Sequence, residues 1–312
     1  MLVVLVRRIL LGVPTTLALT ALLFFSVSAL LGTPATMMLG EDASPTAIAE
    51  LNTRYGFDRP LVVQYLDWLG KAVTGDFGRS FTTRDPVAVS IASALPVTLE
   101  LGLWAILAAV FCAVVTGTLP WTSKLFRNAI VFINVAGVTT PNFMIGIFLI
   151  FLFSVHWGIM PATGWVSWSE GISVHLRHMV LPVLTLTPYY FGAFSFVYKA
   201  ELRQVYGRLY VRTARAKGLS RMAVAFRHAM PNAVLPVITF AGLSMGHLVG
   251  GAVVTETVFS MPGIGRLFVS AIAGRDFPVM LAVGMLVVVC VVLMNLVADV
   301  LYTLVNPQIR LE

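Results

Sequence analysis

The sequence predicts an all-α polytopic membrane protein with six transmembrane helices, and three observations support this fold class. First, 58% of the residues are hydrophobic and only 11% are charged, which is far from the balance of a soluble globular domain. Second, six uncharged runs each reach the roughly 20 residues that a bilayer requires. They are residues 9–31, 101–123, 128–156, 179–198, 229–255 and 277–298. Third, positive charge is concentrated in residues 199–236, which hold eight Lys or Arg and one acid.

The first run follows Arg7 and Arg8, a pattern that also begins secretory signal peptides. At 23 residues it is long for a signal sequence, and the chain after it stays hydrophobic. We therefore interpret residues 9–31 as a retained span whose N-terminus lies inside the cell.

A polar insert, residues 33–96, follows the first span and is expected to form a small external cap. Two stretches within it, 46–55 and 60–73, have helical character. The second stretch is amphipathic, with apolar residues on one face at Leu61, Tyr65, Trp68 and Leu69. Two roles fit the cap: a folded cover without chemistry, or a docking surface for an extracytoplasmic substrate-binding protein.

Loop charges predict the orientation of the chain, because Lys and Arg resist translocation across the membrane. Lys124 and Arg127 lie between the second and third spans with no acid nearby, whereas residues 154–178 contain one Arg and one Glu. Successive loops are therefore expected to alternate between the cytoplasmic and the external side of the membrane. Residues 33–95 and 257–276 are expected outside, with residues 199–232 and both termini in the cytoplasm.

The basic segment, residues 199–232, is predicted to contain two helices joined by a glycine. Residues 203–217 contain no proline and only one glycine, Gly207, which favours a helix. Gly218 can take the left-handed conformation that ends a helix, and Ser220 can cap the next one. The second helix carries Met222, Phe226 and Met230 on one face. Such a helix fits a groove in another protein, and anchoring to anionic lipid is the alternative.

The same segment resembles the cytoplasmic loop of ABC importer permeases. That loop has the pattern Glu-Ala-Ala, three residues, Gly, nine residues and Ile-x-Leu-Pro. Ala214, Gly218 and Pro231 occupy the second alanine, the glycine and the proline, whereas Arg212 replaces the glutamate. With Arg212 at the glutamate position, the segment resembles the loops of the dipeptide, oligopeptide and nickel branch of the family. The resemblance includes the run YVRTARAKGLS, the run RHA and the Asn-Ala pair.

The resemblance extends over nearly the whole chain. It includes GDFGRSF at 75–81, LPVTLEL at 95–101 and GGAVVTETVFSMPGIGRL at 250–267. It implies a type I ABC importer permease fold, one permease domain over residues 1–312, and the first of two permease types. It is specific for the family but not for the cargo.

The resemblance also implies partners in the cell inner membrane. A second permease subunit would complete the pore, two ATP-binding subunits would dock below, and an extracytoplasmic substrate-binding protein would deliver cargo. This chain would bind no cofactor, and ATP and Mg would sit on the partner subunits. The cargo would be short peptides, dipeptides or oligopeptides, with nickel or a metal chelate as the alternative. The residues expected to couple to the ATPase are Arg212, Ala214, Gly218, Leu219, Ser220, Met222, Phe226 and Pro231.

The fifth span carries glycines four residues apart, which allow a helix or a peptide backbone to approach closely. We expect this stripe and two flanking polar residues to line the translocation path or the seam with the partner permease. These residues are Gly242, Ser244, Gly246, His247 and Gly250. Close packing inside the subunit is the competing interpretation. The G-x-S-x-G match within this stripe lacks the strand and turn of a hydrolase.

Other function classes fit the sequence less well. The formal charge of +7 is explained by lipid headgroups and an acidic partner rather than nucleic acid, because no aromatic residues interleave the basic ones on a soluble face. A secondary transporter or channel would need charges within the membrane, and the acids near the spans, Glu100, Glu256 and Asp299, lie at or near span ends. The sequence has no P-loop and no catalytic cluster, so we expect no enzyme activity.

The histidines and cysteines give no metal or redox signal. His156, His175 and His178 bracket an external loop without the spacing of a metal-binding helix. Cys112 and Cys290 both lie in apolar runs, where a cysteine behaves as a small hydrophobic residue. We therefore expect neither a metal site nor a disulfide.

Overall fold

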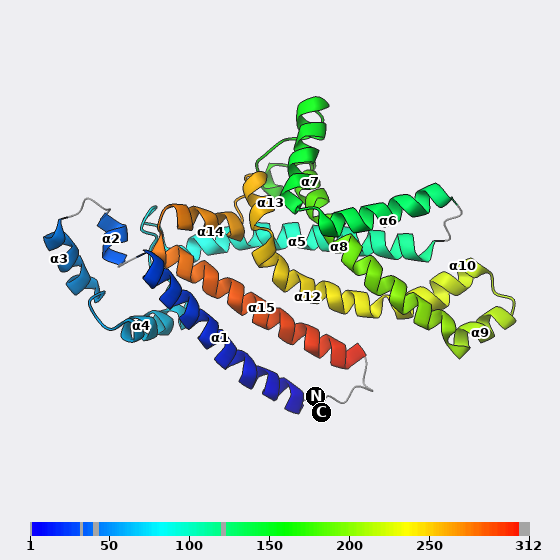
Figure 1. Cartoon of the computed structure of the whole chain (residues 1–312), viewed down its shortest axis with the longest axis horizontal. Coiled ribbons are helices and arrows are strands. Elements are labelled where there is room, and N and C mark those ends of the chain that lie inside the picture. The colour runs from blue at the N-terminus through cyan, green and yellow to red at the C-terminus, as the bar shows by residue number, and fades with distance from the viewer. Residues whose placement is uncertain (1, 32–33, 40–43, 120–122, 306–312) are drawn as a thin grey trace. The chain divides into compact units, whose positions relative to one another are not determined.

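The computed structural model describes residues 2–31, 34–39, 44–119 and 123–305, and regular structure in these residues is helical apart from one isolated bridge between Arg79 and Pro86 (Figure 1). Four of these helices are long and apolar enough to cross a membrane, or up to six spans if two bent pairs each count as one. The all-α polytopic fold class is confirmed.

The chain divides into two compact units. One unit contains residues 1–98 and 262–293, and the other contains residues 99–261 and 294–312.

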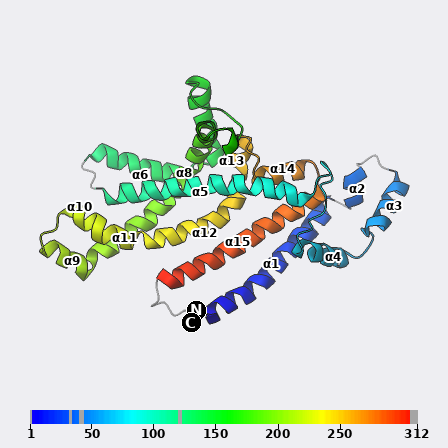
Figure 2. The same cartoon turned by 180° about the vertical axis from the view of Figure 1, so that it is seen from behind.

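In the first unit, helix α1 (Leu2–Leu31) lies beside helix α15 (Phe277–Val305) in both views (Figures 1 and 2). Glycines allow the two helices to approach closely. A methyl group added at Gly12 would lie 3.2 Å from the Val292 side chain, and one added at Gly284 would overlap Leu23. Both helices are therefore held by contacts that leave no room for a larger residue.

The insert after the first span forms three helices, α2 (Pro34–Leu39), α3 (Pro45–Tyr55) and α4 (Leu61–Val73). The two helices predicted at 46–55 and 60–73 are confirmed, whereas α2 was not predicted. Helix α4 lies against α1, because the Tyr65 hydroxyl donates to the carbonyl oxygen of Leu17 at 3.0 Å. Leu61 is 45% exposed, so it does not belong to the packed face that was predicted for this helix.

A buried aspartate ties the GDFGRSF segment to the loop between helix α14 (Ile264–Ala273) and α15. The Asp276 carboxylate accepts hydrogen bonds from the Ser80 hydroxyl and from the backbone N–H groups of Phe81 and Thr82, at 3.0 and 3.3 Å for the latter two. Thr98 binds the N-terminus of α14, with its Oγ1 accepting from the Ile264 N–H at 2.8 Å.

Helix α5 (Val87–Thr118) begins well before the predicted span at 101–123. Residues 87–98 contain no charge, so nothing in them opposes extension of the helix. Pro96 lies inside it. As a result, Glu100 lies within the helix and not at its end.

The third predicted span, 128–156, is not a continuous helix. Helix α6 (Lys124–Thr139) ends before Pro141, and helix α7 (Asn142–Leu149) continues into a π-helix, η1 (Ile150–His156). The two parts are bent by 116°. Thr140 is extended (φ −85°, ψ 129°), as expected because a proline disfavours the helical conformation in the residue before it.

Helix α8 (Ile172–Gly207) packs closely on α6 within the second unit. A methyl group at Gly137 would overlap the carbonyl of Pro188, and one at Gly192 would lie 2.6 Å from the carbonyl oxygen of Asn134. The fifth run forms helix α12 (Leu235–Gly251), followed by the short helix α13 (Val253–Val258). A short 3₁₀ helix, η2 (Trp168–Glu170), precedes α8.

The basic segment folds as a series of short helices at the end of α8: α9 (Leu209–Ala216), α10 (Arg221–Val224), a π-helix η3 (Ala225–Ala229) and α11 (Met230–Ala233). The predicted helix over residues 203–217 is wrong, because the chain breaks at Arg208, which is extended (φ −73°, ψ 148°) directly after Gly207.

Candidate coupling surface and translocation path

The turn between α9 and α10 has the geometry that the sequence indicates. Gly218 has a φ of +79°, and its N–H donates to the carbonyl oxygen of Arg215 at 2.9 Å. The Ser220 hydroxyl accepts from the N–H of Ala223 at 3.2 Å, which caps α10. A methyl group added at Gly218 would meet no atom within 4 Å, so backbone conformation alone favours glycine here.

The residues around this turn separate into an inner and an outer set. Ala214 is buried together with Val211, Val224 and Ala225, and these residues hold the short helices in place. The other residues predicted to couple to an ATPase are exposed, and we call them the coupling surface: Arg212, Gly218, Leu219, Ser220, Met222, Phe226 and Pro231.

The coupling surface combines apolar side chains with positive charge. Met222 and Phe226 are each 42% exposed and lie one helical turn apart. Six basic residues of the same segment are also exposed, and none forms an ion pair in the described part of the chain. They are Arg208, Arg212, Arg215, Lys217, Arg221 and Arg227. Such a surface suits a protein groove that is apolar at its centre and acidic at its rim.

The residues predicted to line the path lie on one helix, α12, but not on one face. Gly246 is buried, Gly242 is half-buried, and Gly250 is exposed. Residues four apart turn about 400° along an α-helix, so this row drifts by about 40° at each step. The three glycines therefore lie in different environments, and the stripe reaches the surface only at Gly250.

The two polar residues beside this stripe also differ. The Ser244 side chain is 7% exposed, and its hydroxyl already donates to the carbonyl oxygen of Phe240 at 2.8 Å. His247 is exposed. His247 and Gly250 are thus the members of the predicted set that the subunit leaves open, and the roles of all five residues stay predictions.

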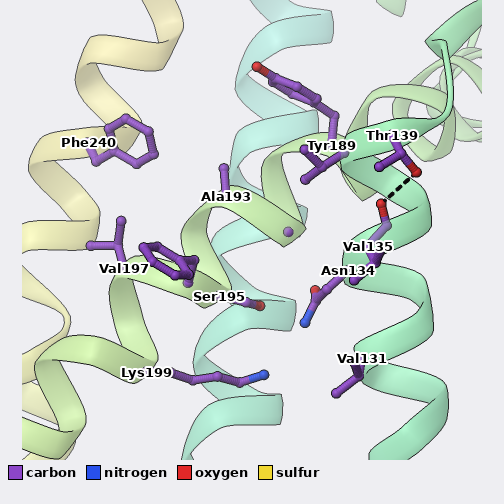
Figure 3. Close-up of a pocket in the computed structure, with 13 residues that line it drawn as sticks. Val131, Asn134, Val135, Thr139, Tyr189, Ala193, Ser195, Val197, Lys199 and Phe240 are labelled. Atoms are coloured by element: carbon purple, nitrogen blue, oxygen red, sulfur yellow. Dashed lines mark hydrogen bonds between the residues drawn. The ribbon is translucent and has the colours of Figure 1, made fainter.

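A cavity of about 600 Å³ between α6, α8 and α12 was not predicted from the sequence (Figure 3). Most of its walls are apolar, but Thr139 and Tyr189, which carry hydroxyl groups, and the polar residues Asn134, Ser195 and Lys199 also line it. Asn134 is far in sequence from Ser195 and Lys199, and none of the three belongs to a motif. Only the spacing of Ser195 and Lys199, one helical turn apart, could have indicated a shared face.

A polar contact between Glu100 and His175 joins α5 to the start of α8. His175 is fully buried, with Nε2 2.8 Å from a carboxylate oxygen of Glu100 and Nδ1 2.6 Å from the carbonyl oxygen of Val166. Its ring stacks on Trp168 with the centroids 3.9 Å apart. These contacts give His175 a structural role, and the described residues contain no group of three His, Cys, Asp or Glu that could hold a metal.

Comparison with known families places this chain. Residues 105–311 match the family described as binding-protein-dependent transport system inner membrane component, and residues 1–102 match the N-terminal family of the same membrane components. The chain belongs to this transport family. The predicted resemblance to ABC importer permeases is therefore confirmed.

Individual relatives cover nearly all of the chain. It is 38% identical to the di/tripeptide transport system permease protein DppB of Pseudomonas aeruginosa (strain UCBPP-PA14), over 97% of each chain. It is 36% identical to the dipeptide transport system permease protein DppB of Escherichia coli (strain K12), over 99% of each chain. It is 37% identical to the glutathione transport system permease protein GsiC of Escherichia coli (strain K12), over 98% of each chain.

Proposed function

We propose that this chain is one of two permease subunits of an ATP-driven ABC importer that carries short peptides. One observation carries the proposal: relatives named for dipeptide, di/tripeptide and glutathione transport align with 97–99% of the chain. These cargoes are short peptides or peptide-like molecules. The shared feature is a backbone with charged ends, and not any particular side chain.

The coupling surface supports an ATP-binding partner. Met222 and Phe226 are exposed on a short helix that is capped by Ser220 and held from behind by buried alanines. We propose that each ATP-binding subunit of a pair takes the coupling surface of one permease in a groove. ATP and Mg would bind to those subunits, and this chain would hydrolyse nothing itself.

We propose an orientation that is supported by the positive charge of the segment that carries the coupling surface. With residues 199–232 and both termini in the cytoplasm, the helices α3 and α4 lie outside the cell. We propose that they face an extracytoplasmic substrate-binding protein. Helix α4 is suited to transmit contact with that protein, because Tyr65 bonds directly to the first span at Leu17 and Thr20.

Nickel or a metal chelate remains the alternative cargo for the same machinery. The relatives named above carry peptide names, so the peptide assignment is favoured. A secondary transporter or channel is not supported, because the chain belongs to a family of binding-protein-dependent components.

Reconstitution of the complete importer tests this proposal. The permease, its partner permease, both ATP-binding subunits and the binding protein are assembled in liposomes, and uptake of a radiolabelled dipeptide, of glutathione and of ⁶³Ni is measured with and without ATP. We expect ATP-dependent uptake of the dipeptide. Uptake that continues when the ATP-binding subunits are left out, or that is confined to nickel, would overturn it.

A further inference from the structure

The cavity between α6, α8 and α12 contains an unusual combination of groups. Its volume of about 600 Å³ is within the range of about 300–1,000 Å³ that is typical of small-molecule sites. Valine and aromatic side chains, including Phe196 and Phe240, form most of its wall. Against this apolar background, the few polar groups decide which ligand can bind.

Three polar side chains point toward the same part of the cavity (Figure 3). Ser195 is 1% exposed, and its hydroxyl has no hydrogen-bond partner in the structure. The side-chain oxygen of Asn134 is buried and also lacks a partner. A buried polar group without a partner destabilises the folded protein, so a ligand that bonds to both groups is favoured.

Lys199 adds a positive charge to this pair. It lies on α8 one turn after Ser195 and is half-buried, and it forms no ion pair within the described residues. A buried or half-buried ammonium group is stabilised by an anion. The cavity therefore offers an ammonium group and a hydroxyl as donors, and an amide that can both donate and accept.

The close packing of α8 on α6 determines the position of the Asn134 side chain. Gly192 lies directly opposite Asn134, where any side chain would overlap the Asn134 carbonyl oxygen. This close approach of α6 and α8 places the Asn134 amide beside Ser195. The arrangement of the three groups therefore depends on the packing of two helices and not on a flexible loop.

We propose that this cavity is a subsite for the C-terminal end of a peptide in transit. Lys199 and Ser195 bind the terminal carboxylate, and the Asn134 oxygen accepts the N–H of the last residue. Every linear peptide carries this carboxylate and most carry this N–H, so the subsite reads the backbone, while the apolar wall accommodates different side chains. This proposal rests on the proposed peptide importer function and assigns residues outside the predicted stripe on α12.

The position of the subsite along the path follows from Lys199. This residue begins the segment that loop charge places on the cytoplasmic side. The subsite would therefore hold a peptide on the inner half of the path, after it has left the binding protein.

A comparison of two cargoes tests the proposal in the complete importer in liposomes. The cargoes are a tripeptide with a free carboxylate and the same tripeptide with a C-terminal amide, both at concentrations that saturate the binding protein. We expect Lys199→Met to lower uptake of the carboxylate form by roughly tenfold more than uptake of the amide form. Lys199→Arg is the matched control. It keeps the positive charge, so it should retain most of the wild-type preference for the carboxylate form.

Asn134→Asp provides an independent variant of nearly identical shape. Its carboxylate would pair with Lys199 and repel the cargo carboxylate, so uptake of the carboxylate form should fall while the amide form is affected less. Size-exclusion chromatography of each assembled complex shows whether a variant has folded. A variant that fails to assemble is replaced by Ser195→Ala, for which the same but smaller preference is expected.

Three outcomes would overturn the subsite. An equal loss of uptake for both cargoes in Lys199→Met would show that Lys199 has only a structural role. A loss that appears only in liposomes containing phosphatidylglycerol, and not in phosphatidylcholine, would make the cavity a lipid site. Unchanged uptake of both cargoes by Lys199→Met and Asn134→Asp would mean that the cavity does not bind the cargo carboxylate. If the wild-type importer takes up neither peptide, the proposed function itself fails, and this result is distinct from the other three.

Discussion

The backbone of Gly218 sets the direction in which the chain leaves α9. Its φ of +79° would cost a residue other than glycine about 1–2 kcal/mol of backbone strain, although the space around Gly218 is open. A Cβ atom added at this position therefore affects the turn itself and meets no atom of the subunit.

We predict that Gly218→Val lowers cargo uptake and cargo-stimulated ATP hydrolysis, because the turn that aims α10 would change. Gly207→Val is the matched control. Gly207 also has no neighbouring atom within 4 Å but does not have a positive φ. Both rates are measured in the reconstituted importer after the amount of assembled complex has been equalised. Similar rates for Gly218→Val and wild type would rule out this role of the turn.

The Asp276 carboxylate anchors the loop that contains residues 80–82. It is 3% exposed and accepts three hydrogen bonds from residues 80–82. We predict that Asp276→Asn releases this loop, because an amide NH₂ would face N–H and O–H donors, at a cost of about 2 kcal/mol. Trypsin cleavage at Arg79 and Arg84, both exposed, should become faster.

The control for this change is Asp67→Asn. Asp67 pairs with Arg59 at 3.2 Å, but both side chains are more than half exposed, so the pair contributes about 0–1 kcal/mol. Equal cleavage rates in the two variants would show that Asp276 does not hold the loop.

At the scale of the helices, the contact of α6 with α8 leaves no space for a methyl group at Gly137. We predict that Gly137→Ala lowers the thermal-unfolding midpoint of the detergent-solubilised importer, because the added methyl group would overlap the Pro188 backbone. Overpacking of this kind costs about 1–3 kcal/mol. Gly251→Ala is the control at a helical position with no atom within 4 Å, and its midpoint should be unchanged or slightly higher. If the midpoint of Gly137→Ala equals that of wild type, Gly137 does not pack as closely on Pro188 as the structure shows.

Helix α12 leads to a prediction that separates packing from transport. Gly246 is buried, so Gly246→Leu should lower the amount of assembled complex. His247 is exposed on the same helix, so His247→Ala should leave assembly intact and lower uptake. Pull-down yields and uptake rates measure the two effects. Unchanged uptake by both variants would remove α12 from the path and from the seam.

The helices also show where the sequence is a poor guide. Pro14, Pro96, Pro182 and Pro188 all lie inside helices, whereas Pro141 follows a helix end. A proline in an apolar helix is tolerated when neighbouring groups satisfy the freed backbone, and this depends on packing that hydropathy does not describe. For this reason, the apolar run at 128–156 was predicted as one span although it bends by 116°.

At the scale of the whole molecule, composition and apolar runs were sufficient for the fold class, and local chemistry was sufficient for the turn at Gly218 and Ser220. The cavity was not predictable in the same way. Asn134 and Ser195 come from helices whose contact depends on Gly137 and Gly192, and no local pattern indicates which glycines meet a neighbouring helix.

Topology is tested on the whole molecule by cysteine labelling. Cys112 and Cys290 are replaced by alanine, and single cysteines are then introduced beside Asp58 or Arg215. In intact cells, a membrane-impermeant maleimide should label the site near Asp58 and not the site near Arg215, because the basic segment resists translocation. The reverse pattern would invert the orientation, and labelling of both sites would show that the bent α6–α7 pair does not count as one crossing.

The π-helix η3 has a consequence for how the chain can change in length. Its wider turn accommodates one more residue than an α-helix would between the Ser220 cap and Pro231. Deleting one residue from Ala225–Ala229 would restore regular winding and rotate Met222 by about 100° relative to α12. An indel at this site therefore acts as a rotation of the coupling surface and not as a simple shortening.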